Sequence, residues 1–327
     1  MLNFAIKYSI IGLIGLLLSA CDSAKTPLEW QTYATLGLYS AAISNDGRFA
    51  VIGAQAEGGS LWKIETAERL YDWNHQKSTR SLIAKTAFSP EGEFAVTANQ
   101  QDLVLWHTAT GKAEWFWSSP GEILDIALTS NGREALVGLA NHTAVIFDIV
   151  NGGIKHTLRH GGRVRSVALS KNGKFAITGA DDYTTSIWDI STAKRVQQMT
   201  LDNIIDTVAL SDDGELAFSA SSLDKGIIWS PITGKIISYI SGNESFTKKR
   251  ISYLSARFSD DNTQLLTGSS SGSVKLWDAQ DGSLLEYWQA HKKHAYGPTS
   301  VSVIAVGFSD QGGYLAVGSN GVLNQFE

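Results

Sequence analysis

Short apolar runs separated by turn sequences fill most of the chain, and the clearest example lies at residues 164–190. The runs, rich in β-branched residues, cover residues 164–169, 175–178 and 186–190. Lys171-Asn172-Gly173 separates the first two, and Asp181-Asp182-Tyr183 separates the last two. Asn and Gly accept positive φ angles at little steric cost, so apolar runs joined in this way predict an antiparallel β-meander.

The same unit recurs seven times along the chain. Its spacing of about forty to fifty residues is the repeat length of a four-stranded propeller blade. Each copy has a turn, then a strand that is apolar on both faces, then a strand ending in a large aromatic residue. Strands of this kind are typical of sheets packed between other sheets. The turns begin near Ser44, Ser89, Ser130, Lys171, Asp212, Asp260 and Asp310. The aromatic residues are Trp62, Trp106, Phe147, Trp188, Trp229, Trp277 and Phe326.

The ends of three copies resemble the Trp-Asp pair of WD40 repeat proteins. The pairs are Phe147-Asp148, Trp188-Asp189 and Trp277-Asp278. The resemblance covers about residues 28–327, and it implies an all-β, seven-bladed WD40-like β-propeller. It also implies a buried tetrad, which one unit matches at all four positions. Those positions are His160, Thr178, Asp182 and Trp188. We therefore expect this tetrad in one blade and ordinary packing in most others, and we prefer a structural role for His160 to that of a ligand or base.

Six units are followed by a further strand, whereas the seventh ends at Glu327 directly after its third strand. The missing strand has a donor at the other end of the chain. Residues 28–33 precede the first unit, and they resemble residues 285–288 of the sixth. We therefore predict a ring closed by an N-terminal outer strand, which removes two open sheet edges.

The N-terminus does not follow the repeat. Its apolar run, residues 9–20, is short for a membrane span and ends in Leu18-Ser19-Ala20-Cys21. This resembles the lipobox of bacterial lipoproteins, and Cys21 is the only Cys, so no disulfide can form within the chain. We predict a lipoprotein signal peptide at 1–20, a lipidated Cys21 with a short tether at 21–27, and the propeller at 28–327. The alternative is an ordinary secretory signal with a chance Cys.

Lipidation with more than one acyl chain, palmitate among them, makes a stable membrane anchor. The expected location is the bacterial cell envelope, facing the periplasm. Asp22 resembles an inner-membrane retention signal and favours that membrane. The formal net charge of −5 lacks the basic bias of nucleic-acid binders, so no nucleic-acid partner is predicted.

The long loops between blades are the expected binding region, because long loops on a rigid scaffold often carry function. They place basic and aromatic residues around blades six, seven, one and two. The candidate partner-binding residues are Lys77, Arg80, Lys248, Lys249, Arg250, His291, Lys292, Lys293, His294 and Tyr296. We predict a non-catalytic scaffold that binds another envelope protein, with its oligomeric state open. Ordinary solvated loops are the alternative interpretation.

Catalytic patterns are weak in this chain. Gly268-Ser269-Ser270-Ser271-Gly272 fits the G-x-S-x-G pattern but lies between two predicted strands, not in a strand-to-helix turn. His291 and His294 have no carboxylate nearby, so neither a metal site nor a cofactor is predicted. An alternative function is small-ligand binding or catalysis at the mouth of the central channel. Its candidate residues are Lys85, Asp125, Arg165, Asp206 and Arg257.

Overall fold

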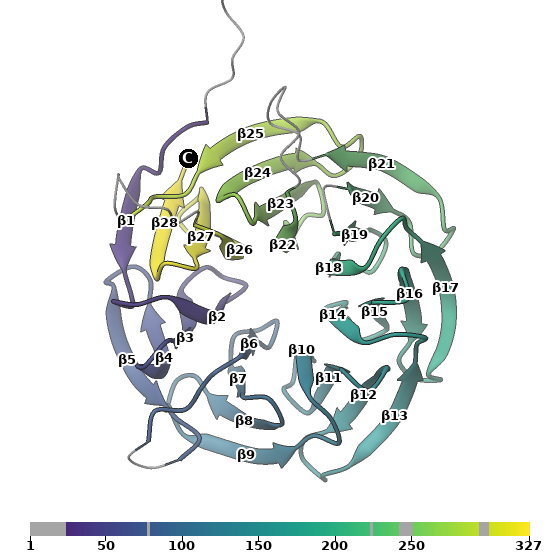
Figure 1. Cartoon of the computed structure of the whole chain (residues 1–327), viewed down its shortest axis with the longest axis horizontal. Coiled ribbons are helices and arrows are strands. Elements are labelled where there is room, and N and C mark those ends of the chain that lie inside the picture. The colour runs from purple at the N-terminus through teal and green to yellow at the C-terminus, as the bar shows by residue number, and fades with distance from the viewer. Residues whose placement is uncertain (1–23, 77–78, 223–224, 242–250, 294–300) are drawn as a thin grey trace, which may run out of the picture.

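The computed structural model describes residues 24–76, 79–222, 225–241, 251–293 and 301–327. The elements in these ranges are β-strands, and they form seven four-stranded antiparallel sheets arranged as blades around a central channel (Figure 1). None of the described elements is a helix long and apolar enough to cross a membrane. The predicted all-β, seven-bladed propeller is confirmed.

Each blade runs from an inner strand at the channel to an outer strand at the circumference. Blade 1 has β2 (Leu38–Ile43), β3 (Phe49–Ala54), β4 (Gly58–Lys63) and β5 (Glu68–Trp73). Blade 2 has β6 (Lys85–Phe88), β7 (Phe94–Ala98), β8 (Asp102–His107) and β9 (Ala113–Ser118). Blade 3 has β10 (Ile123–Leu128), β11 (Glu134–Leu139), β12 (Thr143–Asp148) and β13 (Ile154–Arg159). Blade 4 has β14 (Val164–Leu169), β15 (Phe175–Ala180), β16 (Thr184–Asp189) and β17 (Lys194–Thr200).

The remaining blades repeat this order. Blade 5 has β18 (Ile205–Leu210), β19 (Ala217–Ser221), β20 (Lys225–Trp229) and β21 (Ile236–Ser241). Blade 6 has β22 (Tyr253–Phe258), β23 (Gln264–Ser269), β24 (Ser273–Asp278) and β25 (Leu284–Gln289). Blade 7 has β26 (Val303–Phe308), β27 (Tyr314–Gly318), β28 (Val322–Phe326) and the N-terminal β1 (Glu29–Thr32).

The first turn of each blade is built by its own sequence. In blade 4, Ser170 Oγ donates to Asn172 Oδ1 at 2.7 Å and accepts from the Phe175 N–H at 3.0 Å. Gly173 follows with a φ of 67°, which a residue without Cβ adopts freely. Other blades form the same hydroxyl-to-Asx hydrogen bond. Its pairs are Ser44 with Asp46, Thr129 with Asn131, Ser211 with Asp213 and Ser259 with Asp261.

The core consists of apolar layers between neighbouring blades. One layer joins Leu61 and Trp73 of blade 1 to Val104 and Trp106 of blade 2. The two indoles stack with their centroids 5.3 Å apart, and Trp73 is fully buried. Large buried aromatic side chains supply much of the hydrophobic stabilisation of such layers, about 1.5–3 kcal/mol or more each.

The ring closes between the two ends of the chain. β1 pairs antiparallel with β28, from Glu29 opposite Gln325 to Thr32 opposite Val322. This confirms the predicted closure by an N-terminal outer strand.

The segment before β1 is also held against the ring. The Lys25 N–H donates to the Tyr287 carbonyl oxygen at 3.0 Å, and the Gln289 N–H donates to the Lys25 carbonyl oxygen at 2.9 Å. These bonds form a parallel β-bridge opposite Trp288, and Lys25 Nζ lies 2.5 Å from a Glu286 carboxylate oxygen. The sequence prediction placed Lys25 in the tether, and the structure places it on the outer edge of β25.

Candidate protein-binding face

One face of the ring carries the loops between blades together with the hairpins between second and third strands. We call it the inter-blade face. Three of its loops converge on the β3–β4 hairpin of blade 1. Lys293 Nζ donates to the carbonyl oxygens of Ala34 and Thr35 at 2.6 and 3.2 Å. The Arg80 guanidinium donates to the Ala56 carbonyl oxygen. The structure therefore brings these two predicted partner-binding residues into one region and ties both to the backbone.

Glu57 is the carboxylate at the centre of this region. Its Oε1 accepts from the hydroxyl and the N–H of Thr35 at 2.6 and 3.0 Å, and Arg69 lies 3.9 Å from its other oxygen. The Thr35 hydroxyl holds the pKa of Glu57 below its usual value, with help from Arg69 and Arg80 and against the effect of burial. Burial lowers the pKa of Lys293, and the charge of Glu57 opposes that shift. Sequence reasoning overlooked Glu57 because it searched the inter-blade loops, whereas Glu57 lies in a hairpin.

The other described candidates lie nearby. His291 stacks on Trp30 with ring centroids 4.0 Å apart, and its N–H donates to Asn324 Oδ1 at 2.7 Å. Lys292 is exposed. The remaining candidates lie outside the described residues, and they are Lys77, Lys248, Lys249, Arg250, His294 and Tyr296.

Four apolar side chains in blades 6, 1 and 2 and the loops before them are exposed on the same face, and we call them the apolar arc. They are Leu36, Tyr39, Leu82 and Leu254, each between 39% and 54% exposed. Tyr39 and Leu254 stand at register shifts of the inner strands β2 and β22, positions that redirect a side chain out of the regular sheet. Blades 4 and 5 carry Arg165 and Asp206 at the equivalent shifts. These inner-strand positions are therefore apolar in blades 1 and 6 and charged in blades 4 and 5.

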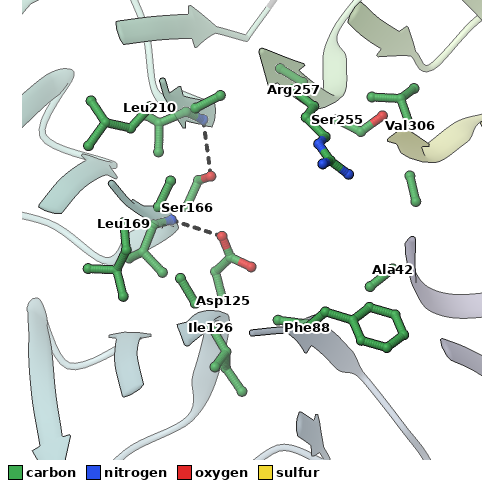
Figure 2. Close-up of a pocket in the computed structure, with 18 of the residues that line it drawn as sticks. Ala42, Phe88, Asp125, Ile126, Ser166, Leu169, Leu210, Ser255, Arg257 and Val306 are labelled. Atoms are coloured by element: carbon green, nitrogen blue, oxygen red, sulfur yellow. Dashed lines mark hydrogen bonds between the residues drawn. The ribbon is translucent and has the colours of Figure 1, made fainter. Parts of the chain in front are cut away.

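The central channel is lined by the inner strands of all seven blades and contains about 320 Å³ of solvent-accessible space (Figure 2). A ring of side chains at one level hydrogen-bonds to the backbone of the following blade, at its inner strand or just before it. Three of these side chains donate to carbonyl oxygens: Ser40 to Ile83, Thr207 to Tyr253 and Ser255 to Val303. Two accept from backbone N–H groups: Asp125 Oδ2 from Val167 and Ser166 Oγ from Val208. They measure 2.8 to 3.2 Å. The polar lining thus joins blades to one another.

Asp125 supplies the carboxylate of this ring. Burial raises its pKa, and Lys85, the N–H groups of Val167 and Ile126, and the Ser166 hydroxyl act in the opposite direction. Figure 2 shows its carboxylate directed at the backbone of the next blade. Asp125 therefore acts as a structural acceptor in the channel wall.

Arg257 lines the channel nearer the opposite face. The equivalent residue is Ala42 in blade 1 and Gly307 in blade 7, so a long side chain here is a departure from the repeat. Its guanidinium donates to the carbonyl oxygens of Ser44 and Asn45 at 3.2 and 2.8 Å. Burial lowers the pKa of Arg257, and the charges of nearby Asp residues oppose this.

The other charged channel candidates also have partners. Arg165 and Arg163 both bind the Asp181 carboxylate, the latter at 2.7 Å. Asp206 accepts a hydrogen bond from the Ser222 hydroxyl. These side chains stabilise the rim of the channel, and they do not converge on one site within the described residues.

The predicted tetrad residues of blade 4 lie together. Thr178 Oγ1 accepts from Trp188 Nε1 at 2.8 Å and lies 2.8 Å from His160 Nε2. His160 Nδ1 lies 3.6 Å from Asp182 Oδ2, and this carboxylate also accepts from the Gly161 N–H at 2.7 Å. Burial lowers the pKa of His160, and the Asp182 charge opposes that effect. The arrangement gives a buried indole N–H and a buried imidazole a shared oxygen.

Comparison with protein families gave two matches to the model described as WD domain, G-beta repeat, at residues 152–189 and 235–278. Each match runs from the outer strand of one blade through the third strand of the next, β13 to β16 and β21 to β24. The chain therefore contains WD40 repeats, and its fold is a seven-bladed β-propeller. No curated protein matches the chain.

A His–Thr–Trp chain also occurs in blade 2, outside the one blade for which the full tetrad was expected. In blade 2, Thr97 Oγ1 accepts from Trp106 Nε1 at 2.8 Å and lies 3.0 Å from His75 Nε2. The charge of Asp102 acts on His75 much as that of Asp182 acts on His160. Asp102 follows Thr97 by five residues, whereas Asp182 follows Thr178 by four, so the two blades do not share the tetrad spacing.

The weak catalytic patterns have structural explanations in the propeller. Ser270 lies in the β23–β24 hairpin, and its hydroxyl accepts from the Ser252 N–H at 3.1 Å. Among the described residues, no group of three or more His, Cys, Asp or Glu side chains is arranged to hold a metal ion. WD40 domains usually act as non-catalytic protein scaffolds.

Proposed function

We propose that this WD40-repeat propeller is a membrane-anchored, non-catalytic scaffold that binds another cell-envelope protein through its inter-blade face. WD40 propellers commonly bind proteins. The observation that carries the proposal is the apolar arc, since exposed apolar side chains surrounded by polar groups often mark protein-interaction sites.

The network around Glu57 supports the same face. Arg80 and Lys293 fix their loops to the blade 1 hairpin and to the preceding loop, so the backbone beside Leu36 and Leu82 is held by several hydrogen bonds. A surface fixed in this way loses less conformational entropy when a partner binds. Lys292 is exposed next to this region and offers a positive charge to an acidic group of the partner.

The membrane anchor rests on the sequence, because Cys21 lies outside the described residues. The lipobox-like Leu18-Ser19-Ala20-Cys21 motif supports lipidation of Cys21, and Asp22 supports retention at the inner membrane, facing the periplasm. Replacing Cys21 by Ser is expected to release the protein from the membrane fraction and to remove the lipid mass. An intact lipid mass on the Cys21→Ser variant would contradict this assignment.

The binding face is tested with the full-length protein affinity-purified from membranes after cross-linking. The double variant Tyr39→Glu, Leu254→Glu puts charge into the apolar arc, and partner recovery is expected to fall at least tenfold. The matched control is Ile154→Glu, Val196→Glu, which alters equally exposed apolar residues on the outer strands β13 and β17. Equal recovery with both variants, at unchanged melting temperature, would exclude the apolar arc as the binding site.

A further inference from the structure

The first described residues are fixed to the circumference of the ring. Lys25 forms two backbone hydrogen bonds with β25, the outermost strand of blade 6, and its ammonium group contacts Glu286. Three residues later the Leu28 N–H donates to the Gln325 carbonyl oxygen of blade 7 at 2.8 Å. The segment thus crosses the outside of the ring from blade 6 to blade 7 (Figure 1). The predicted tether is therefore held against the ring from Lys25 onward.

This contact limits how far the ring can lie from the bilayer, given the lipidated Cys21 of the proposed function. Three Cα-to-Cα steps separate Cys21 from Ala24. Fully extended, they span at most about 11 Å. The glycerol of the lipid group sits at the membrane surface, so the part of the circumference around Lys25 has to lie close to that surface.

The same part of the circumference exposes large apolar side chains. Leu28 and Trp30 are 61% and 52% exposed, and Leu284 and Leu285 of β25 are each 44% exposed. Leu28 and Trp30 belong to the segment that follows Lys25, while the two leucines begin the strand that Lys25 joins. Trp side chains favour the interface between lipid and water, and leucines gain free energy by leaving water.

We propose that blades 6 and 7 rest edge-on against the phospholipid bilayer, with Leu28, Trp30, Leu284 and Leu285 as the contact. This rests on the proposed lipidation. The segment is fixed at this surface, and only a few residues separate it from Cys21. For these two reasons we identify the bilayer as the partner of this surface. Edge-on contact leaves the inter-blade face, including the apolar arc, open to the periplasm for a partner.

The test places one fluorescent probe at a time on the full-length lipoprotein. Lipidation converts the Cys21 thiol to a thioether, so an introduced Cys is the one free thiol. In one variant, Leu285→Cys, an environment-sensitive dye is attached at the proposed contact. In a second, Phe116→Cys, the dye is attached to strand β9, which lies across the ring from β25; Phe116 is also well exposed (Figure 1). A third variant, Tyr39→Cys, reports on the inter-blade face. Each is reconstituted in vesicles of phosphatidylethanolamine and phosphatidylglycerol that contain a spin-labelled lipid quencher.

We expect quenching at position 285 to exceed that at positions 116 and 39 at least threefold. Equal quenching at 285 and 116, or stronger quenching at 39, in protein whose intact mass includes the lipid would overturn edge-on contact while leaving the anchor in place. A mass without lipid would overturn the anchor and the edge-on contact together. The two failures are therefore distinguishable in one preparation.

Discussion

Arg257 and Asn45 are joined across the central channel. An Nη atom of Arg257 donates to the Asn45 carbonyl oxygen at 2.8 Å, although one residue belongs to blade 6 and the other to blade 1. Blade 7 lies between them, and it is the blade assembled from both ends of the chain. Arg257 therefore links the two neighbours of the closing blade independently of the β1–β28 pairing.

Replacing Arg257 by Ala is expected to destabilise the protein by about 2–3 kcal/mol, because two charge-assisted hydrogen bonds are lost. Urea unfolding followed by Trp fluorescence measures this change. Arg133→Ala, in the exposed first turn of blade 3, is the matched control and should stay within about 0.5 kcal/mol of the wild type. Equal stability of both variants would mean that the link across blade 7 contributes nothing.

Thr178→Val keeps the side-chain volume but removes the oxygen shared by His160 and Trp188. Each buried donor left without a partner costs about 1–3 kcal/mol, so we expect a loss of about 2–4 kcal/mol. Thr97→Val should cost a similar amount, since His75 and Trp106 share its oxygen in the same way. Thr178→Ser retains the hydroxyl and is the control. A Thr97→Val variant as stable as the wild type would show that the hydrogen bonds of Thr97 with His75 and Trp106 do not stabilise the protein.

Stability should fall as the pH is lowered from 7.5 to 5.5. Burial holds the pKa values of His75 and His160 below the value of about 6.5 found in unfolded chains. The unfolded chain then binds more protons, so the stabilisation present above pH 6.5 is lost as the pH falls toward the folded pKa. Each histidine contributes a slope of at most about 1.4 kcal/mol per pH unit.

The double variant His75→Asn, His160→Asn should show a flatter pH dependence, measured by urea unfolding at pH 7.5, 6.5 and 5.5. His142→Asn changes an exposed histidine with a positive φ, which Asn tolerates, and should keep the wild-type slope. An unchanged slope in the double variant would show that other groups cause the pH dependence.

Asp125→Asn is expected to stabilise the protein at pH 7.5 by about 1 kcal/mol, because it removes a buried charge and keeps an oxygen for the Val167 N–H. The raised pKa of Asp125 means that its ionisation opposes folding as the pH rises through the folded pKa. The gain should therefore vanish at pH 3, where the carboxyl is neutral. Loss of stability in the variant at pH 7.5 would show that attraction to Lys85 outweighs the cost of burial.

The fold could be predicted because its signals are local and repeated. In most first turns a hydroxyl and an Asx side chain, such as Ser170 and Asn172, form hydrogen bonds that span no more than five residues. The closing strand could be predicted because a blade without a fourth strand requires one. The regular spacing of the apolar strands then predicted seven four-stranded sheets arranged in a ring.

The candidate face depends on contacts that spacing does not encode. Lys293 binds Ala34 and Thr35, residues far away in the sequence, and Glu57 joins a hairpin to that loop only after the ring has closed. The bridge between Lys25 and β25 depends on the same closure. The sequence could therefore indicate the loops. It could not indicate which of their charged side chains, such as Lys293, hydrogen-bond to backbone carbonyl oxygens.

Pairing of β1 with β28 sets the order in which the ring can be completed. The strand made first, Glu29–Thr32, has to wait for Val322–Phe326, which is made last. A chain that stops before Val322 leaves β1 without its partner. A ribosome that stops early therefore produces an unsealed ring with open sheet edges, which proteases and chaperones can distinguish from the finished protein.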